Sequence, residues 1–161
     1  RPMADEIVPP CPRGRLFPKQ QKIHVSSEAD LGQSLLATGF PYDVRVSSVN
    51  NAVHFNHFLT RAQAIRRCGS AALDLCYVAC GRFDGFWELK LHPWDVAAGG
   101  LIAQEAGGML SDFDGGGFSI HKPEALATNG LIHEAMMRVL QMGKRQQSEA
   151  GDKRHDDQKE K

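Results

Sequence analysis

Short apolar runs bounded by glycine or proline predict several buried strands. One run lies between Gly32 and Gly39, and another alternates large apolar with other residues until Pro93 removes a backbone donor. The predicted strands are residues 34–38, 83–91, 109–112 and 125–128, with a fifth, short or irregular strand before Gly69.

Between these runs, apolar positions recur every three or four residues, which is typical of one face of a helix. The predicted helices are residues 51–66, 71–80, 95–106 and 131–142. The third is bounded by Asp95 as the N-cap and by Gly107-Gly108 as the stop signal. Because its surface consists mostly of alanine and glycine, we expect another element, a sheet, to approach its backbone closely.

Composition indicates one globular domain with no excess of charge. The 161 residues are 42% hydrophobic and 24% charged, and the formal net charge is zero. We therefore expect neither nucleic-acid binding nor attraction to an anionic membrane. No apolar run approaches the roughly 20 residues of a membrane span, so a cytoplasmic protein is expected. Beyond Gly143 the chain lacks large apolar side chains, which predicts a disordered tail.

The cysteines and histidines suggest no metal centre. The four cysteines form no C-x-x-C pair, and Cys76 and Cys80 are expected to be small buried thiols. His54 and His57 lie three residues apart in a predicted helix, with no third ligand in view. We expect both histidines to be solvated.

Asp95 is the first candidate for chemistry. A helix N-terminus carries unpaired N–H groups and a partial positive charge, which keep a carboxylate there ionised and oriented. One carboxylate oxygen would then be available to a cation. The alternative is that Asp95 only caps its helix.

The turn at residues 69–71 is the second candidate. Gly69 allows the backbone to come near a ligand, Ser70 supplies a hydroxyl, and free N–H groups point outward at Ser70 and Ala71. The alternative is that Ser70 is a plain N-cap of the following helix.

The stretch Trp94 to Gly108 closely resembles the C-terminal signature of the inositol monophosphatase family. The resemblance extends to residues 34–43 and 69–75 and covers about residues 1–140 in all. It implies an α/β fold, the C-terminal layer of an α-β-α-β-α sandwich, with a mixed sheet and helices on both faces. It also implies a remnant of the N-terminal domain at residues 1–27, a C-terminal domain at 28–142 and a polar tail at 143–161.

The resemblance implies Mg²⁺-dependent hydrolysis of a small phosphorylated polyol. It makes Asp95 a catalytic residue that binds both metal and substrate. The turn of Gly69, Ser70 and Ala71, together with Glu88, would hold hydroxyls of the leaving alcohol. Asp74 matches a structural position and is left out of the predicted site. Members of the family are commonly homodimers, so a homodimer is a further expectation.

The sequence lacks the Asp-Pro-x-Asp-Gly-Thr motif that supplies the family's main metal ligands. The resemblance therefore predicts little or no phosphatase activity from this chain alone. Two alternatives stay open. One is the same chemistry on fructose 1,6-bisphosphate, histidinol phosphate or 3′-phosphoadenosine 5′-phosphate. The other is a non-catalytic regulatory or binding module, since some members associate with transcription machinery.

Overall fold

A five-stranded mixed sheet lies at the centre of the computed structural model, which describes residues 22–47 and 49–156, with side chains as far as residue 148. The strands are Leu35–Thr38 (β1), Ala64–Arg66 (β2), Gly85–Leu89 (β3), Met109–Ser111 (β4) and Glu124–Thr128 (β5). Their order across the sheet is β2-β1-β3-β5-β4. β1 is parallel to β2 and β3, whereas β5 is antiparallel to β3 and β4. All of the predicted strands are present, including the short one before Gly69.

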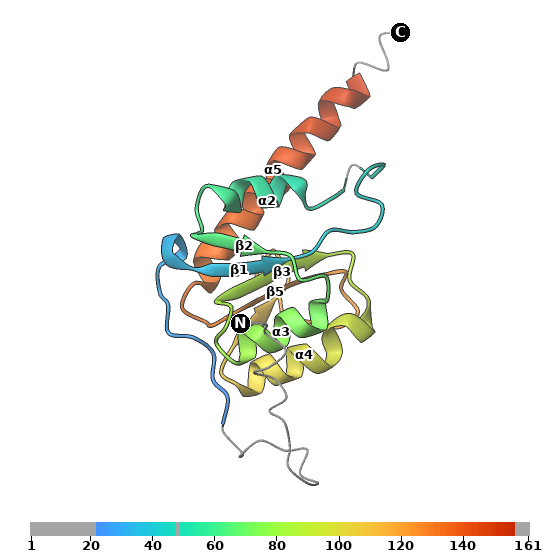
Figure 1. Cartoon of the computed structure of the whole chain (residues 1–161). Helices are drawn as coiled ribbons and strands as arrows, with labels where there is room; N and C mark the ends of the chain where they lie inside the picture. The colour runs from blue at the N-terminus through green and yellow to red at the C-terminus, as the bar shows by residue number, and fades with distance from the viewer. Residues whose placement is uncertain (1–21, 48, 157–161) are drawn as a thin grey trace.

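Helices cover both faces of this sheet (Figure 1). On one face, α2 (Ala52–Leu59) packs against α5 (His133–Asp156). On the other face, α3 (Ala71–Ala79) packs against α4 (Pro93–Glu105). A short 3-10 helix, η1 (Leu31–Gln33), precedes β1. The predicted α/β fold with helices on both faces is confirmed.

Alternate residues of the central strands supply two separate cores. Leu36, Trp87 and Leu126 face the α2/α5 side. Ala37 and Phe86 face the α3/α4 side, where Leu75 and Val78 of α3 meet them. Because both faces are buried, the strands read in the sequence as nearly continuous apolar runs.

The small residues of α4 allow another element to approach its backbone closely, as predicted. At Gly99 this element is the helix α3. A Cβ on Gly99 would lie 2.7 Å from the Leu75 Cβ and 3.1 Å from the Ala72 carbonyl oxygen, both on α3. The expectation that the sheet would make this approach was wrong for Gly99, because α3 lies alongside α4 on the same face.

The predicted helix at residues 51–66 was too long. α2 ends at Leu59, and residues 64–66 form β2, which pairs with residues 35–37 of β1. The spacing was misleading because Ala62 and Ile65 both pack against the same core as Phe58, although they lie outside the helix. Residues 64–66 form a strand because they pair in parallel with β1. This pairing depends on a distant segment, so the local spacing of apolar residues does not reveal it.

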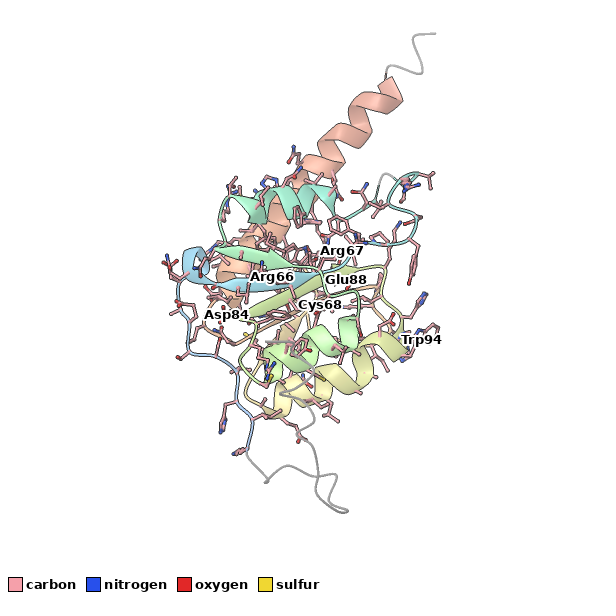
Figure 2. All side chains as sticks on the ribbon, in the orientation of Figure 1. Arg66, Arg67, Cys68, Asp84, Glu88 and Trp94 are labelled. Carbon is pink, nitrogen blue, oxygen red and sulfur yellow. The ribbon has the colours of Figure 1, made fainter. Side chains whose placement is uncertain are left out.

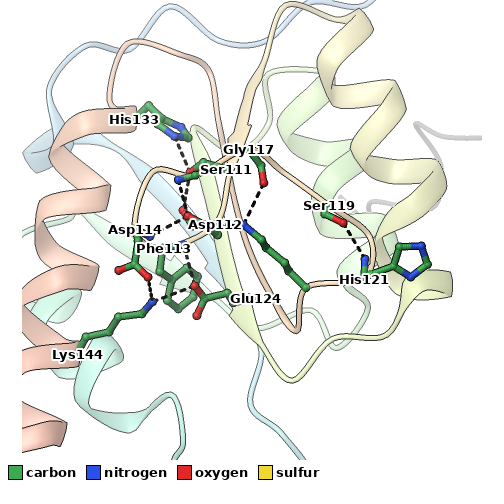
Figure 3. A network of polar contacts seen from close by, with 12 residues as sticks. Ser111, Asp112, Phe113, Asp114, Gly117, Ser119, His121, Glu124, His133 and Lys144 are labelled. Atoms are coloured by element: carbon green, nitrogen blue, oxygen red, sulfur yellow. Dashed lines mark hydrogen bonds and ion pairs between the residues drawn. The ribbon is translucent and has the colours of Figure 1, made fainter.

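The disordered tail predicted from residue 143 was also wrong for most of its length, since α5 continues to Asp156. Lys144 Nζ binds Asp114 Oδ2 at 2.7 Å and Glu124 Oε1 at 2.9 Å (Figure 3). Further along the helix, Gln146 bonds His57 at 2.8 Å and Gln147 donates to the Asn50 carbonyl at 2.8 Å. Polar contacts thus extend the helix where apolar side chains are absent. Residues 1–21 and 157–161 lie outside the described part of the chain. Within that part, no helix is long and apolar enough to cross a bilayer.

His54 is buried, contrary to the expectation that it would be solvated. It is 1% exposed, and its ring lies edge-on to Phe113 with centroids 5.4 Å apart. Its Nδ1 has no hydrogen-bond partner among the described residues. Cys76 and Cys80 are free, as expected, but half-buried rather than buried.

The burial of His54 predicts a loss of stability in mild acid. Burial, followed by the charges of Lys144 and His57, lowers the pKa of His54 from 6.5 to about 4. The unfolded chain therefore binds a proton more readily, so this contribution is present above the unfolded pKa and is lost as pH falls toward 4. Between about pH 7 and about pH 5, we expect the free energy of unfolding to fall by about 2 kcal/mol from this group.

Urea unfolding at both pH values, on the wild type and on His54→Leu, measures this term. The variant is expected to show a shallower pH dependence than the wild type. Equal pH dependences in the two proteins would contradict the assignment.

Candidate functional site

The parallel arrangement of β2, β1 and β3 brings three loops to one edge of the sheet. Strands that run in the same direction end on the same side, where open α/β sheets place their ligands. A cleft of about 690 Å³ opens there, and the segments around residues 39–43, 67–74 and 88–95 line it. Figure 2 marks Arg67 and Glu88 at this edge and Trp94 at the start of α4. All the predicted site residues line this cleft: Gly69, Ser70, Ala71, Glu88 and Asp95.

Asp95 lies at the N-terminus of α4, but it is not the N-cap. The helix begins at Pro93, so His92 is the cap and Asp95 is the third helical residue. Proline suits the first position of a helix because its missing N–H would have no partner there. Asp95 Oδ2 accepts the His92 backbone N–H at 2.9 Å. One carboxylate oxygen is thereby fixed, and the half-buried side chain faces the cleft with the positive end of the helix behind it.

Ser70 is the N-cap of α3. Its Oγ accepts the Leu73 backbone N–H at 3.4 Å, and its backbone is extended. Gly69 has a φ of +84°, a conformation that favours glycine, and a Cβ there would meet nothing within 4 Å. The turn therefore needs Gly69 for its backbone shape. A capping Ser70 still has its hydroxyl proton to donate, so capping and ligand binding are compatible.

Glu88 projects into the cleft from β3, and its charge is disfavoured there. Burial, followed by the charges of Asp74 and Asp95, raises the pKa of Glu88 to about 7, while Arg67 opposes the shift. A Cβ on Gly39, at the end of β1, would collide with both carboxylate oxygens of Glu88. Gly39 is therefore the residue that makes room for Glu88.

Three further cleft residues were not predicted as part of the site. Asp74, which was left out of the predicted site, is 1% exposed and lines the cleft. Arg67 lies over the Phe40 ring, with its guanidinium carbon 5.1 Å from the ring centroid. Lys90 has a φ of 62°. The sequence signal for Arg67 and Lys90 was their place near the ends of predicted strands, whereas Asp74 lies in the predicted helix that follows the Gly69-Ser70 turn.

The described residues do not complete a magnesium site. Asp95 is a suitable single ligand, because Mg²⁺ prefers carboxylate oxygens. However, the part of the chain that the structure describes holds no group of three or more His, Cys, Asp or Glu side chains arranged for a metal. Since Mg²⁺ needs near-octahedral oxygen coordination, Asp95 alone does not hold it tightly.

The sequence model of the inositol monophosphatase family matches residues 1–145. The chain belongs to this family. An inositol-1-monophosphatase from Synechocystis is 46% identical over 121 residues, covering 75% of this chain and 42% of that protein. A Nus factor SuhB from Pseudomonas aeruginosa is 41% identical over 123 residues, covering 75% of this chain and 45% of that protein.

The fold of this chain is also similar to solved structures of the family. The inositol monophosphatase from Anabaena has a TM-score of 0.74 and 46% identity over 76% of this chain and 49% of the other. The Thermotoga maritima enzyme has a TM-score of 0.71 and 34% identity, covering 81% and 49%. The chain thus spans about half the length of these relatives.

Lys90 provides a test of backbone strain at the cleft. Its Nζ binds Asp43 Oδ2 at 2.6 Å and Ser47 Oγ at 2.8 Å, so the side chain holds the loop after β1. We expect Lys90→Gly to be more stable than Lys90→Ala by about 1 kcal/mol, because both variants lose these contacts but only glycine tolerates the positive φ without strain.

Urea unfolding of both variants gives this difference. The matched control is Gln104, exposed in the last turn of α4, where glycine is expected to be less stable than alanine by about 1 kcal/mol. The same sign at both positions would show that Lys90 is not strained.

Proposed function

We propose that this chain is the alcohol-binding half of a Mg²⁺-dependent phosphomonoesterase that hydrolyses inositol monophosphate to inositol and phosphate. The observation that carries the proposal is the convergence of Ser70, Glu88 and Asp95 on one cleft, in the part of the chain that matches the family. The inositol-1-monophosphatase name of the Synechocystis relative supports this choice of substrate.

The residues of the cleft suit a neutral polyol as the leaving group. In the reaction, a water oxygen bonds to phosphorus, the ester P–O bond breaks, and the alcohol leaves with a proton. Glu88 accepts a hydrogen bond from one hydroxyl of the alcohol, and the Ser70 hydroxyl donates to another. The N-termini of α3 and α4 present their positive ends to the negative charge that develops on the leaving oxygen.

Asp95 would be one ligand of the metal in the complete site, with the other ligands supplied from outside the described residues. When bound, Mg²⁺ supplies an activated water and neutralises charge on the phosphoryl group. The cleft of this chain therefore supplies binding and orientation of the alcohol.

The incomplete metal site predicts that the 161-residue chain has little or no turnover of inositol 1-phosphate in the presence of Mg²⁺. Joining it to the upstream half of the Synechocystis inositol-1-monophosphatase is expected to restore Mg²⁺-dependent phosphate release. Release of phosphate, measured for both proteins, is the readout. Turnover by the chain alone at the rate of the joined protein would contradict the proposed division of the site.

In the joined protein, Asp95→Asn is expected to lower kcat by about a hundredfold or more, because it removes a charged ligand from the metal. The control is Glu105→Gln, an exposed carboxylate at the other end of the same helix, which should leave kcat unchanged. Rates within about twofold of the wild type for both variants would rule out a role for Asp95 in the reaction.

The substrate alternatives differ in the alcohol that leaves. The same joined protein, assayed on fructose 1,6-bisphosphate, histidinol phosphate and 3′-phosphoadenosine 5′-phosphate, separates them by the ratio of kcat/KM values.

A second candidate function is a regulatory or binding module. The observation that favours it is the 41% identical relative named as a Nus factor. Asp95→Asn separates the two functions, because it removes the phosphatase activity of the joined protein while a binding function of this fold survives it.

A further inference from the structure

Asp74 is a buried carboxylate with one oxygen left without a partner. It lies on α3, one turn after Ser70, and is 1% exposed. Its Oδ1 has no hydrogen-bond partner among the described residues, although the residue lines the cleft. An unpaired buried acceptor is costly, and its position on the wall of a cleft suggests a ligand as the missing partner.

The described neighbours of Asp74 leave its Oδ1 unpaired. The Cys68 thiol and the Asp74 carboxyl influence each other's pKa. Desolvation, followed by the interaction with Asp74, raises the pKa of the Cys68 thiol to about 11, so the thiol keeps its proton. The Asp74 backbone N–H donates a hydrogen bond to the Ser70 carbonyl at 2.9 Å. Among the described residues, Asp74 Oδ1 is thus left without a hydrogen-bond partner.

A structural aspartate in the same protein has both oxygens occupied. Asp84 Oδ1 accepts the Ser26 hydroxyl at 2.5 Å, and Asp84 Oδ2 accepts the Leu35 backbone N–H at 2.7 Å. This arrangement ties the start of β1 to the start of β3. Asp74 joins no such pair of elements, and its unpaired oxygen belongs to a residue of the cleft wall.

Asp74 and Glu88 lie close enough for their charges to interact. After burial, Asp74 is the largest cause of the raised pKa of Glu88. Two acceptor groups that both line the cleft can bind two hydroxyls of one polyol. A single hydroxyl could use only one of them.

We propose that Asp74 is a further ligand-binding residue, whose unpaired oxygen accepts a hydrogen bond from a second hydroxyl of the leaving alcohol, next to the hydroxyl held by Glu88. This inference rests on the proposed function, since it takes the polyol as the ligand. The last torsion of an aspartate side chain is soft, so the carboxylate can turn its unpaired oxygen toward the cleft without a change of backbone. The bound hydroxyl then supplies the hydrogen-bond partner that this oxygen lacks in the free protein.

The test is titration of the full 161-residue chain with myo-inositol and with its monodeoxy analogues, followed by NMR. In the wild type, removal of the hydroxyl that contacts Asp74 is expected to weaken binding by about tenfold or more, the effect of one hydrogen bond to a charged group. In Asp74→Leu, myo-inositol itself is expected to bind about tenfold more weakly, and the difference between myo-inositol and that analogue disappears. Glu105→Leu, an exposed carboxylate outside the cleft, is the control and should bind as the wild type does.

Thermal unfolding of the same variants separates ligand binding from a structural role. Asp74→Leu removes an unpaired buried polar group, so its Tm is expected to equal or exceed that of the wild type. Asp74→Asn keeps an acceptor and is expected to retain most of the binding. A marked fall in the Tm of Asp74→Leu, with the wild-type difference between myo-inositol and the analogue kept in that variant, would make Asp74 structural and overturn the inference.

Two binding outcomes distinguish this inference from the proposed function. If the wild type binds myo-inositol and Asp74→Leu binds it equally well, Asp74 is not a ligand-binding residue and the proposed function stands. If the wild type binds neither myo-inositol nor any analogue, the polyol as substrate class fails, and the role of Asp74 fails with it.

Discussion

The buried amide of Asn51 locks together the two central strands on which the cleft depends. Its Nδ2 donates to Thr38 Oγ1 at 2.7 Å and to the Gly39 carbonyl at 2.6 Å, and its Oδ1 accepts the Trp87 indole N–H at 2.8 Å. Thr38 Oγ1 in turn donates to the Trp87 carbonyl at 2.6 Å. Such a fully paired buried network is rigid. Because Gly39 and Glu88 directly follow Thr38 and Trp87, the network sets the position of Glu88 against the loop after β1.

Several costly features of the structure lie at the cleft that this network supports. Lys90 has a positive φ, Asp74 has an unpaired oxygen, and Glu88 fits only because Gly39 has no side chain. Like charges also face one another, since Asp74 and Asp95 both raise the pKa of Glu88. Strain and unpaired charge at one site are typical of functional sites, where stability is given up for binding.

The fold could be predicted from the sequence as far as local patterns reach. Strands buried on both faces appear as apolar runs, and glycines mark where helices end, so β1, β3, β4, β5 and the approximate limits of α3 and α4 followed from the residues. The errors lie where a distant partner decides. β2 exists because β1 offers it a parallel edge, and α5 extends past residue 142 because Lys144 meets Asp114 and Glu124. His54 is buried because α5 covers it, with Gly143 packed against its ring.

For the candidate site, the sequence by itself determined the chemistry of the local turns. A glycine-serine turn that opens a helix and an aspartate in the first turn of another helix are short-range features, and both are present. Only the tertiary structure decided that these turns and Glu88 share one cleft, because parallel strands far apart in the chain end on the same edge. It also decided the place of Asp74, since a helix shows from its sequence that it has a buried face but not what that face meets.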